Sequence, residues 1–124
     1  MQTLVEQPFV GCWKSYKTFK HSGAIQLYTE ELFKEFTFGD DRQLSIQTCK
    51  GIRRNTEVLT DNWSIEFSNK RHYLSIRSLK KQYEVITVNH TVLVLLDTDS
   101  NDKTFYAKDC FWKSYLKSNK LQTL

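Results

Sequence analysis

Apolar and polar residues alternate with a period of two along most of this 124-residue chain. That period is typical of β-strands that bury one face. Short turns rich in Gly, Asn and Asp separate the alternating segments, and no long segment has the period of 3.6 residues expected of a helix. The pattern predicts strands at residues 9–19, 31–38, 43–50, 62–68, 71–78, 83–88, 92–97 and 103–113, with a further extended segment at 57–60.

This succession of strands predicts a single all-β domain. Strands joined by short reversals pair with their neighbours in the chain and form an antiparallel up-and-down meander. An open meander exposes two hydrogen-bonding edges, and closure into a barrel removes them. We expect seven to nine strands, closed as an eight-stranded barrel over residues 9–113, with an N-terminal extension at 1–8 and a polar C-terminal tail at 114–124. The long connection at 20–30 is expected to act as a lid.

Several short motifs give this barrel a family resemblance: Gly11-Cys12-Trp13, Phe36-Thr37-Phe38, Trp63-Ser64-Ile65, Tyr83-Glu84-Val85, Leu93-Val94-Leu95 and Phe111-Trp112-Lys113. The chain resembles the lipocalin group of the calycins, and in particular small bacterial lipocalin-like domains, over residues 9–113. In that family a Trp packs at the closed end of the barrel beneath a cation from the last strand, so the resemblance implies a closure signature of Gly11, Trp13, Phe111 and Lys113.

The three cysteines lie on three different predicted strands. If Trp13 and Phe111 point inward, then Cys12 and Cys110 point outward on the two strands that close the barrel. We therefore expect Cys12 and Cys110 to be neighbours, forming either a disulfide or two adjacent thiols. The alternative is that they are two unrelated small apolar residues, since free Cys is often buried as such. The outward Cys49 is assigned no role.

Inward positions of the same parity supply the candidate ligand-binding residues. A cavity of this kind suits a small hydrophobic molecule such as a fatty acid or another lipid, and an inward Lys34 could meet its carboxylate. The alternative is that these side chains only fill the core. The cavity candidates are Lys34, Phe36, Phe38, Leu44, Ile46, Trp63, Phe67, Ile76, Tyr83, Leu95 and Phe105.

Catalytic and metal-binding motifs are not found in the sequence. There is no phosphate-binding Gly-rich loop, no Gly-x-Ser-x-Gly and no His-Glu-x-x-His. His21, His72 and His90 are far apart in sequence and do not have the spacing of metal ligands. We expect a binding protein that is not an enzyme, with no catalytic residue, no metal site and no cofactor.

The formal charge of +4 permits contact with an anionic partner. One alternative function is a barrel that binds single-stranded nucleic acid, with Tyr16, Tyr106 and Trp112 as stacking platforms. We rank it lower, because these aromatics are not interleaved with basic residues on one strand face. A further alternative is a protein-interaction module with a filled core and an outward patch of Tyr106, Cys110 and Trp112. Either a monomer or a homodimer is compatible with the sequence.

The longest apolar run, residues 92–96, is too short to cross a membrane as a helix. The first residues lack the basic head and apolar stretch of a secretory signal. We therefore expect either a cytoplasmic protein, or a secreted or periplasmic one whose leader has already been removed.

Overall fold

The computed structural model describes residues 7–50, 54–77 and 79–122. Its regular structure is mostly β, with a single α-helix at the C-terminal end of the described residues. In chain order the elements are η1 (Gln7–Phe9), β1 (Gly11–Phe19), β2 (Ile25–Leu27), β3 (Leu32–Phe38), β4 (Gln43–Lys50), β5 (Arg54–Ser68), β6 (Arg71–Ile76), β7 (Lys81–Val88), β8 (Val92–Asp97), β9 (Lys103–Lys108) and α1 (Asp109–Gln122).

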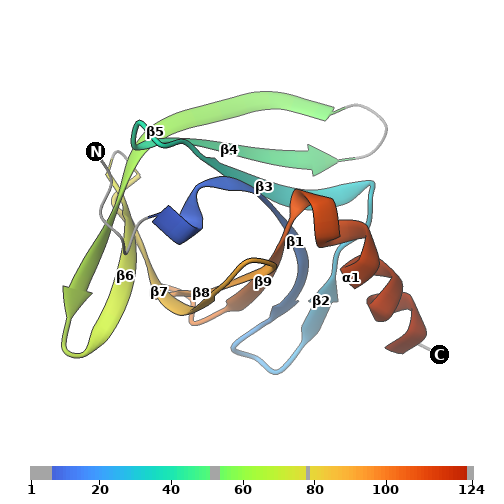
Figure 1. The fold of residues 1–124 in the computed structure, drawn as a ribbon. Coiled ribbons are helices and arrows are strands. Elements are labelled where there is room, and N and C mark those ends of the chain that lie inside the picture. The colour runs from blue at the N-terminus through green and yellow to red at the C-terminus, as the bar shows by residue number, and fades with distance from the viewer. Residues whose placement is uncertain (1–6, 51–53, 78, 123–124) are drawn as a thin grey trace.

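The strands form a closed antiparallel barrel (Figure 1). Strands β3 to β9 pair with their neighbours in chain order, and β1 pairs with β3 on one side and β9 on the other. Eight strands therefore make the ring, and β2 is an extra strand that pairs with β1 within the connection at 20–30. The predicted all-β, up-and-down, eight-stranded barrel is confirmed.

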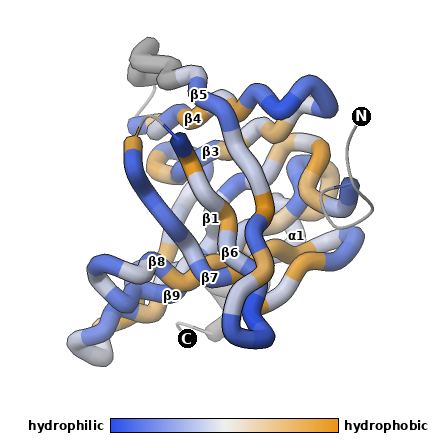
Figure 2. The backbone as a smooth tube through the Cα atoms, turned by 90° about the vertical axis from the view of Figure 1, so that its left-hand side faces the viewer, coloured by the Kyte–Doolittle hydropathy of each residue, from blue (hydrophilic) through white to orange (hydrophobic). Residues whose placement is uncertain are grey.

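The core fills the inside of the ring because the inward positions are apolar. Figure 2 shows hydrophobic and hydrophilic positions alternating along the strands. Phe36 and Phe38 of β3 and Leu93 and Leu95 of β8 are examples of buried alternate positions. Burying such side chains is the main favourable contribution to folding.

One end of the barrel is sealed by aromatic side chains around Trp13, which has an exposed fraction of 0%. η1 lies within the ring of strands (Figure 1) and brings Phe9 over this end. The indole Nε1 of Trp13 donates a hydrogen bond to the carbonyl oxygen of Phe9 at 2.8 Å. The Phe9 ring lies 6.0 Å from that of Phe38 and 6.1 Å from that of Trp63. The expected burial of Trp13 is therefore found.

The predicted partners of Trp13 on the last strand were wrong. β9 ends at Lys108, and Phe111 and Lys113 lie on α1, where both are exposed. The chain leaves the sheet because Trp112 and Leu116, four residues apart, form the buried face of the helix. The cation over the Trp13 ring is Lys108, whose Nζ lies 4.9 Å from the ring centroid.

Helix α1 packs on the outside of the barrel against β1 and β9 (Figure 1). Trp112 is 4% exposed, lies 4.4 Å from the Phe33 ring, and donates from Nε1 to the carbonyl oxygen of Ser15 at 2.9 Å. Lys14 Nζ is 2.6 Å from a carboxylate oxygen of Asp109 in the first turn of the helix. An acidic residue there is favourable because helix N-termini carry partial positive charge.

Cys12 and Cys110 were predicted to form either a disulfide or two adjacent thiols; they form no disulfide, and neither does Cys49. Cys12 lies on β1 opposite Thr37, whereas Cys110 lies in the first turn of α1 instead of on the last strand. Burial raises the pKa of the Cys12 thiol despite a hydrogen bond with Thr37. Cys49 was expected to point outward. It belongs to the cluster on the outside of the barrel that also contains Phe33 and Trp112, and it is buried there.

Candidate functional site

A cavity of about 370 Å³ lies at the end of the barrel opposite Phe9 and Trp13. We call it the open-end cavity. Its wall consists of inward side chains from the barrel strands together with residues of β2 and the nearby turns. The lining residues are Thr18, Lys20, Gln26, Tyr28, Lys34, Phe36, Ile46, Thr48, Leu79, Tyr83, Leu95, Asp97, Ser100, Asp102, Thr104 and Tyr106.

The cavity lies where β1 changes its partner. β1 pairs with β3 as far as the pair Lys14 and Glu35, and residues 17–19 pair with β2 instead. Where β1 separates from β3, the backbone N–H of Lys34 donates a hydrogen bond to Ser15 Oγ at 2.8 Å. The hydroxyl of Ser15 thus satisfies an amide that the strand ladder leaves without a backbone partner. Tyr28, which follows β2, completes this side of the wall.

Some of the predicted cavity residues do line this cavity and others lie elsewhere. Lys34, Phe36, Ile46, Tyr83 and Leu95 are part of its wall. Four other predicted cavity residues fill the solid core instead, each with an exposed fraction of 2% or less: Phe38, Leu44, Trp63 and Ile76.

Two of the predicted inward residues do not point into the barrel. Phe67 is 67% exposed, because it lies near the tip of the hairpin between β5 and β6. Phe105 packs outside the wall, 6.0 Å from the ring of Tyr16. The parity used for the last strand was wrong, since Thr104 and Tyr106 of β9 point inward.

A hydroxyl cluster in the cavity wall was missed from the sequence. Thr18 Oγ1 lies 2.9 Å from the hydroxyl oxygen of Tyr28 and 2.8 Å from Oγ1 of Thr104. All three side chains are at least nine-tenths buried. Thr18 points inward only because a bulge between Ser15 and Lys17 shifts the register of β1 against β9. Strict alternation from Trp13 would place it outward.

Tyr106 adds a buried phenol to the same wall. Its side chain is 2% exposed, and its ring stacks on that of Phe36 at 5.1 Å. Burial raises the pKa of Tyr106 well above its ordinary value, and burial also raises the pKa of Tyr83. Both hydroxyls therefore stay protonated at neutral pH and can donate hydrogen bonds.

Charged groups of both signs lie in the lining. Lys81 Nζ is 2.8 Å from a carboxylate oxygen of Asp97. Burial alone would raise the pKa of Asp97, but hydrogen bonds from Lys81 and from the amides of Asp99 and Ser100 outweigh burial and lower it. Asp102 accepts a hydrogen bond from the backbone N–H of His21 at 2.9 Å. Of the two lining lysines, Lys20 and Lys34, neither forms an ion pair with another described side chain.

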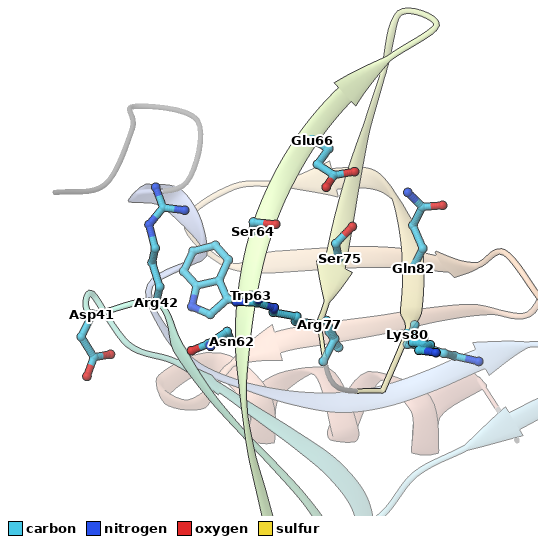
Figure 3. A pocket seen from close by; sticks show the side chains of 12 residues that line it. Asp41, Arg42, Asn62, Trp63, Ser64, Glu66, Ser75, Arg77, Lys80 and Gln82 are labelled. Carbon is cyan, nitrogen blue, oxygen red and sulfur yellow. The ribbon is translucent and has the colours of Figure 1, made fainter.

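A wider groove of about 700 Å³ runs over β5, β6 and β7 (Figure 3). Ser64, Glu66, Ser75 and Gln82 come from these three neighbouring strands, at positions that alternate with core residues. The turns and the start of β7 add both signs of charge: Asp41, Arg42, Arg77 and Lys80 from the turns, and Lys81 from β7. The groove lies outside the barrel, so it does not match the predicted cavity inside the barrel.

The aromatic platforms proposed for nucleic acid or protein contact are buried. Tyr16 is 6% exposed, Tyr106 is 2% and Trp112 is 4%. Tyr106 lies in the core, Tyr16 is covered by α1, and Trp112 lies on the face of α1 that packs against the barrel. These three side chains therefore form neither a stacking surface nor an exposed patch. Cys110, the remaining residue of the predicted protein-contact patch, is exposed on α1, and the barrel itself is compatible with either alternative.

Comparison with protein-family models, curated proteins and solved structures gave no significant match. In the described part of the chain, no three His, Cys, Asp or Glu side chains gather as a metal-binding group. No helix among residues 7–50, 54–77 and 79–122 has both the length and the apolar character needed to span a membrane.

Proposed function

We propose that this barrel binds a small, largely hydrophobic molecule in its open-end cavity and does not catalyse a reaction. The observation that carries the proposal is the cavity itself. Its volume of about 370 Å³ falls in the range of small-molecule sites, and Phe36, Ile46 and Leu95 supply apolar side chains in a lining that is otherwise mostly polar or charged. The closed eight-stranded barrel with a cation over Trp13 is also compatible with the lipocalin-like resemblance.

Binding without catalysis is supported by the state of the titratable groups in the cavity. A general base needs an available lone pair and a pKa near the working pH. The carboxylate of Asp97 is held by Lys81 and by backbone amides, and its pKa is lowered. The pKa values of Tyr83 and Tyr106 are raised, which makes their hydroxyls weaker acids.

The proposal is tested by native mass spectrometry of the purified protein and by titration with an environment-sensitive dye and a panel of lipids. We expect a co-purified small molecule, or a saturable response accompanied by a higher melting temperature, since a ligand that binds only the folded state stabilises it. Filling the cavity with Ile46→Trp should abolish the response. Ile86→Trp is the matched control, because Ile86 is 40% exposed and lies outside the cavity lining.

Two results would contradict the proposal. One is the absence of any saturable response across the panel. The other is a response that the folded Ile46→Trp variant retains in full, because the ligand would then bind somewhere other than the open-end cavity.

A further inference from the structure

The hydroxyl cluster in the wall of the open-end cavity has one proton more than its own hydrogen bonds use. Thr18, Tyr28 and Thr104 each carry one hydroxyl proton. The two hydrogen bonds that join them through Thr18 Oγ1 use two of the three protons. No other described residue accepts a hydrogen bond from these hydroxyls, so one donor is left over at the cavity wall.

Tyr106 supplies a second donor to the same cavity. Its hydroxyl forms no hydrogen bond with another described residue, although the side chain is only 2% exposed. The nearest carboxylate in the lining, Asp97, is already engaged: one oxygen accepts from the amides of Asp99 and Ser100, and the other pairs with Lys81. Because Tyr106 is part of the cavity lining, its hydroxyl can donate to an acceptor from outside the chain, and such a hydrogen bond would be stabilising.

Charge in the lining is nearly balanced and does not demand a charged ligand. Lys20 and Lys34 contribute two positive charges, and Asp97 and Asp102 contribute two negative ones, with Lys81 adjacent to Asp97. Beside its apolar side chains the cavity offers hydrogen-bond donors, on Tyr106 and on the hydroxyl cluster, that no described residue uses.

We infer that the ligand is a small apolar molecule with a terminal oxygen acceptor, a carbonyl or a carboxylate, which receives hydrogen bonds from Tyr106 and from the cluster of Thr18, Tyr28 and Thr104. This inference rests on the proposed function and specifies its ligand class. The volume of about 370 Å³ sets the size. At about 30 Å³ for each water-sized group, the cavity holds about twelve non-hydrogen atoms.

Three naphthalene derivatives of about this size differ only in the group under test. They are naphthoate, acetylnaphthalene and ethylnaphthalene, substituted at the same ring position. A site built to donate hydrogen bonds rejects an analogue without an acceptor, because its donors are then left unpaired. We expect naphthoate and acetylnaphthalene to bind at least about fivefold more tightly than ethylnaphthalene, measured by calorimetry or fluorescence titration.

Two variants locate the preference in the protein. Tyr106→Phe removes the hydroxyl and keeps the ring, and a combined Thr18→Val, Tyr28→Phe and Thr104→Val variant removes all three hydroxyls of the cluster, because loss of only Thr104 or only Tyr28 would still leave one unused donor. Each should weaken binding of the two acceptor compounds by about two- to tenfold and leave ethylnaphthalene unchanged. Tyr73→Phe is the matched control, because Tyr73 lies on β6 outside the cavity lining and should change none of the three affinities. Thermal melting checks that each variant is folded.

The outcomes separate this inference from the proposed function. If all three compounds bind with equal affinity, or if both variants keep the full preference for an acceptor, the inference is overturned while the proposed function stands. If none of the compounds shows saturable binding to the wild-type protein, the result counts against the proposed function as well.

Discussion

At the scale of single residues, the closed end depends on a stack of Gly11, Trp13 and Lys108. Lys108 Nζ lies 4.9 Å from the Trp13 ring, and its side chain passes directly beside Gly11. A Cβ on residue 11 would lie 2.8 Å from Lys108 Cε, and the φ of +133° at Gly11 disfavours any other residue. The Gly at this position thus leaves room for the cation that covers the indole.

Replacing Lys108 by Ala should lower the free energy of unfolding by about 1 kcal/mol, the typical contribution of a cation resting on an aromatic ring. The measurement is urea denaturation followed by Trp fluorescence. Lys113→Ala is the matched control, since Lys113 is exposed on α1, and its effect should stay within about 0.5 kcal/mol. A larger loss from Lys113→Ala than from Lys108→Ala would mean that the cation has been assigned to the wrong lysine.

The burial of Trp13 could be predicted from the sequence, and the identity of its cation could not. Alternation through residues 103–113 looked like one strand, because aromatic residues such as Phe111 and Trp112 are enriched in strands. The sequence did contain a helical signal that was not used: Trp112 and Leu116 are four residues apart and follow an acidic residue, Asp109. That signal identifies a helix only when the outer face of the barrel is known to carry apolar side chains, such as Tyr16 and Phe33, that the helix can bury.

At the scale of elements, the bulge in β1 decides which side chains meet the cavity. One extra residue between Ser15 and Lys17 reverses the alternation, so that Thr18 points inward and Phe19 outward. A sequence read with a period of two has no local sign of such a reversal. The strands and their order could therefore be predicted, as could Phe36 and Leu95, while the hydroxyl cluster could not.

The packing of α1 on β1 predicts a loss of stability at alkaline pH. Burial, together with the nearby Tyr115, raises the pKa of Tyr16 to about 12. The two rings are stacked at 4.7 Å. Because an unfolded Tyr loses its proton near pH 10, the stabilisation is complete below about pH 10 and is lost as the pH rises through 12.

Urea denaturation at a series of pH values checks this expectation. Between pH 10 and pH 12 the wild-type protein should lose on the order of 2 kcal/mol more than Tyr16→Phe, which has no hydroxyl to ionise at this position. The difference between the two proteins at neutral pH is the baseline. Parallel curves over the whole range would show that Tyr16 ionises in the folded protein as readily as in the unfolded one.

At the scale of the whole molecule, the barrel is sealed at one end and hollow at the other. The number of strands predicts closure, because eight strands enclose an interior just wide enough for side chains or one small ligand. Which half is solid depends on where the large aromatics gather. Phe9, Trp13, Phe38 and Trp63 pack together at one end, whereas β1 parts from β3 at the other and leaves the open-end cavity.

This asymmetry predicts a gradient of amide hydrogen exchange along the barrel. β2 has only three residues and pairs only with β1, and its Ile25 is 59% exposed, so its amides can exchange through local opening. The amides around Trp13 and Leu93 lie on strands paired on both sides and should exchange only through global unfolding. Exchange in β2 is expected to be at least about a hundredfold faster.

A ligand in the open-end cavity should reduce that difference. Gln26 and Tyr28 belong to the cavity lining, so an occupant would be lost whenever β2 opens, and its binding free energy would add to the cost of opening. Protection of the β2 amides should therefore rise with ligand concentration, while amides at the Trp13 end gain only the increase in global stability. Equal protection of β2 and of the Trp13 end in the ligand-free protein would contradict this expectation, because β2 would then unfold only together with the core.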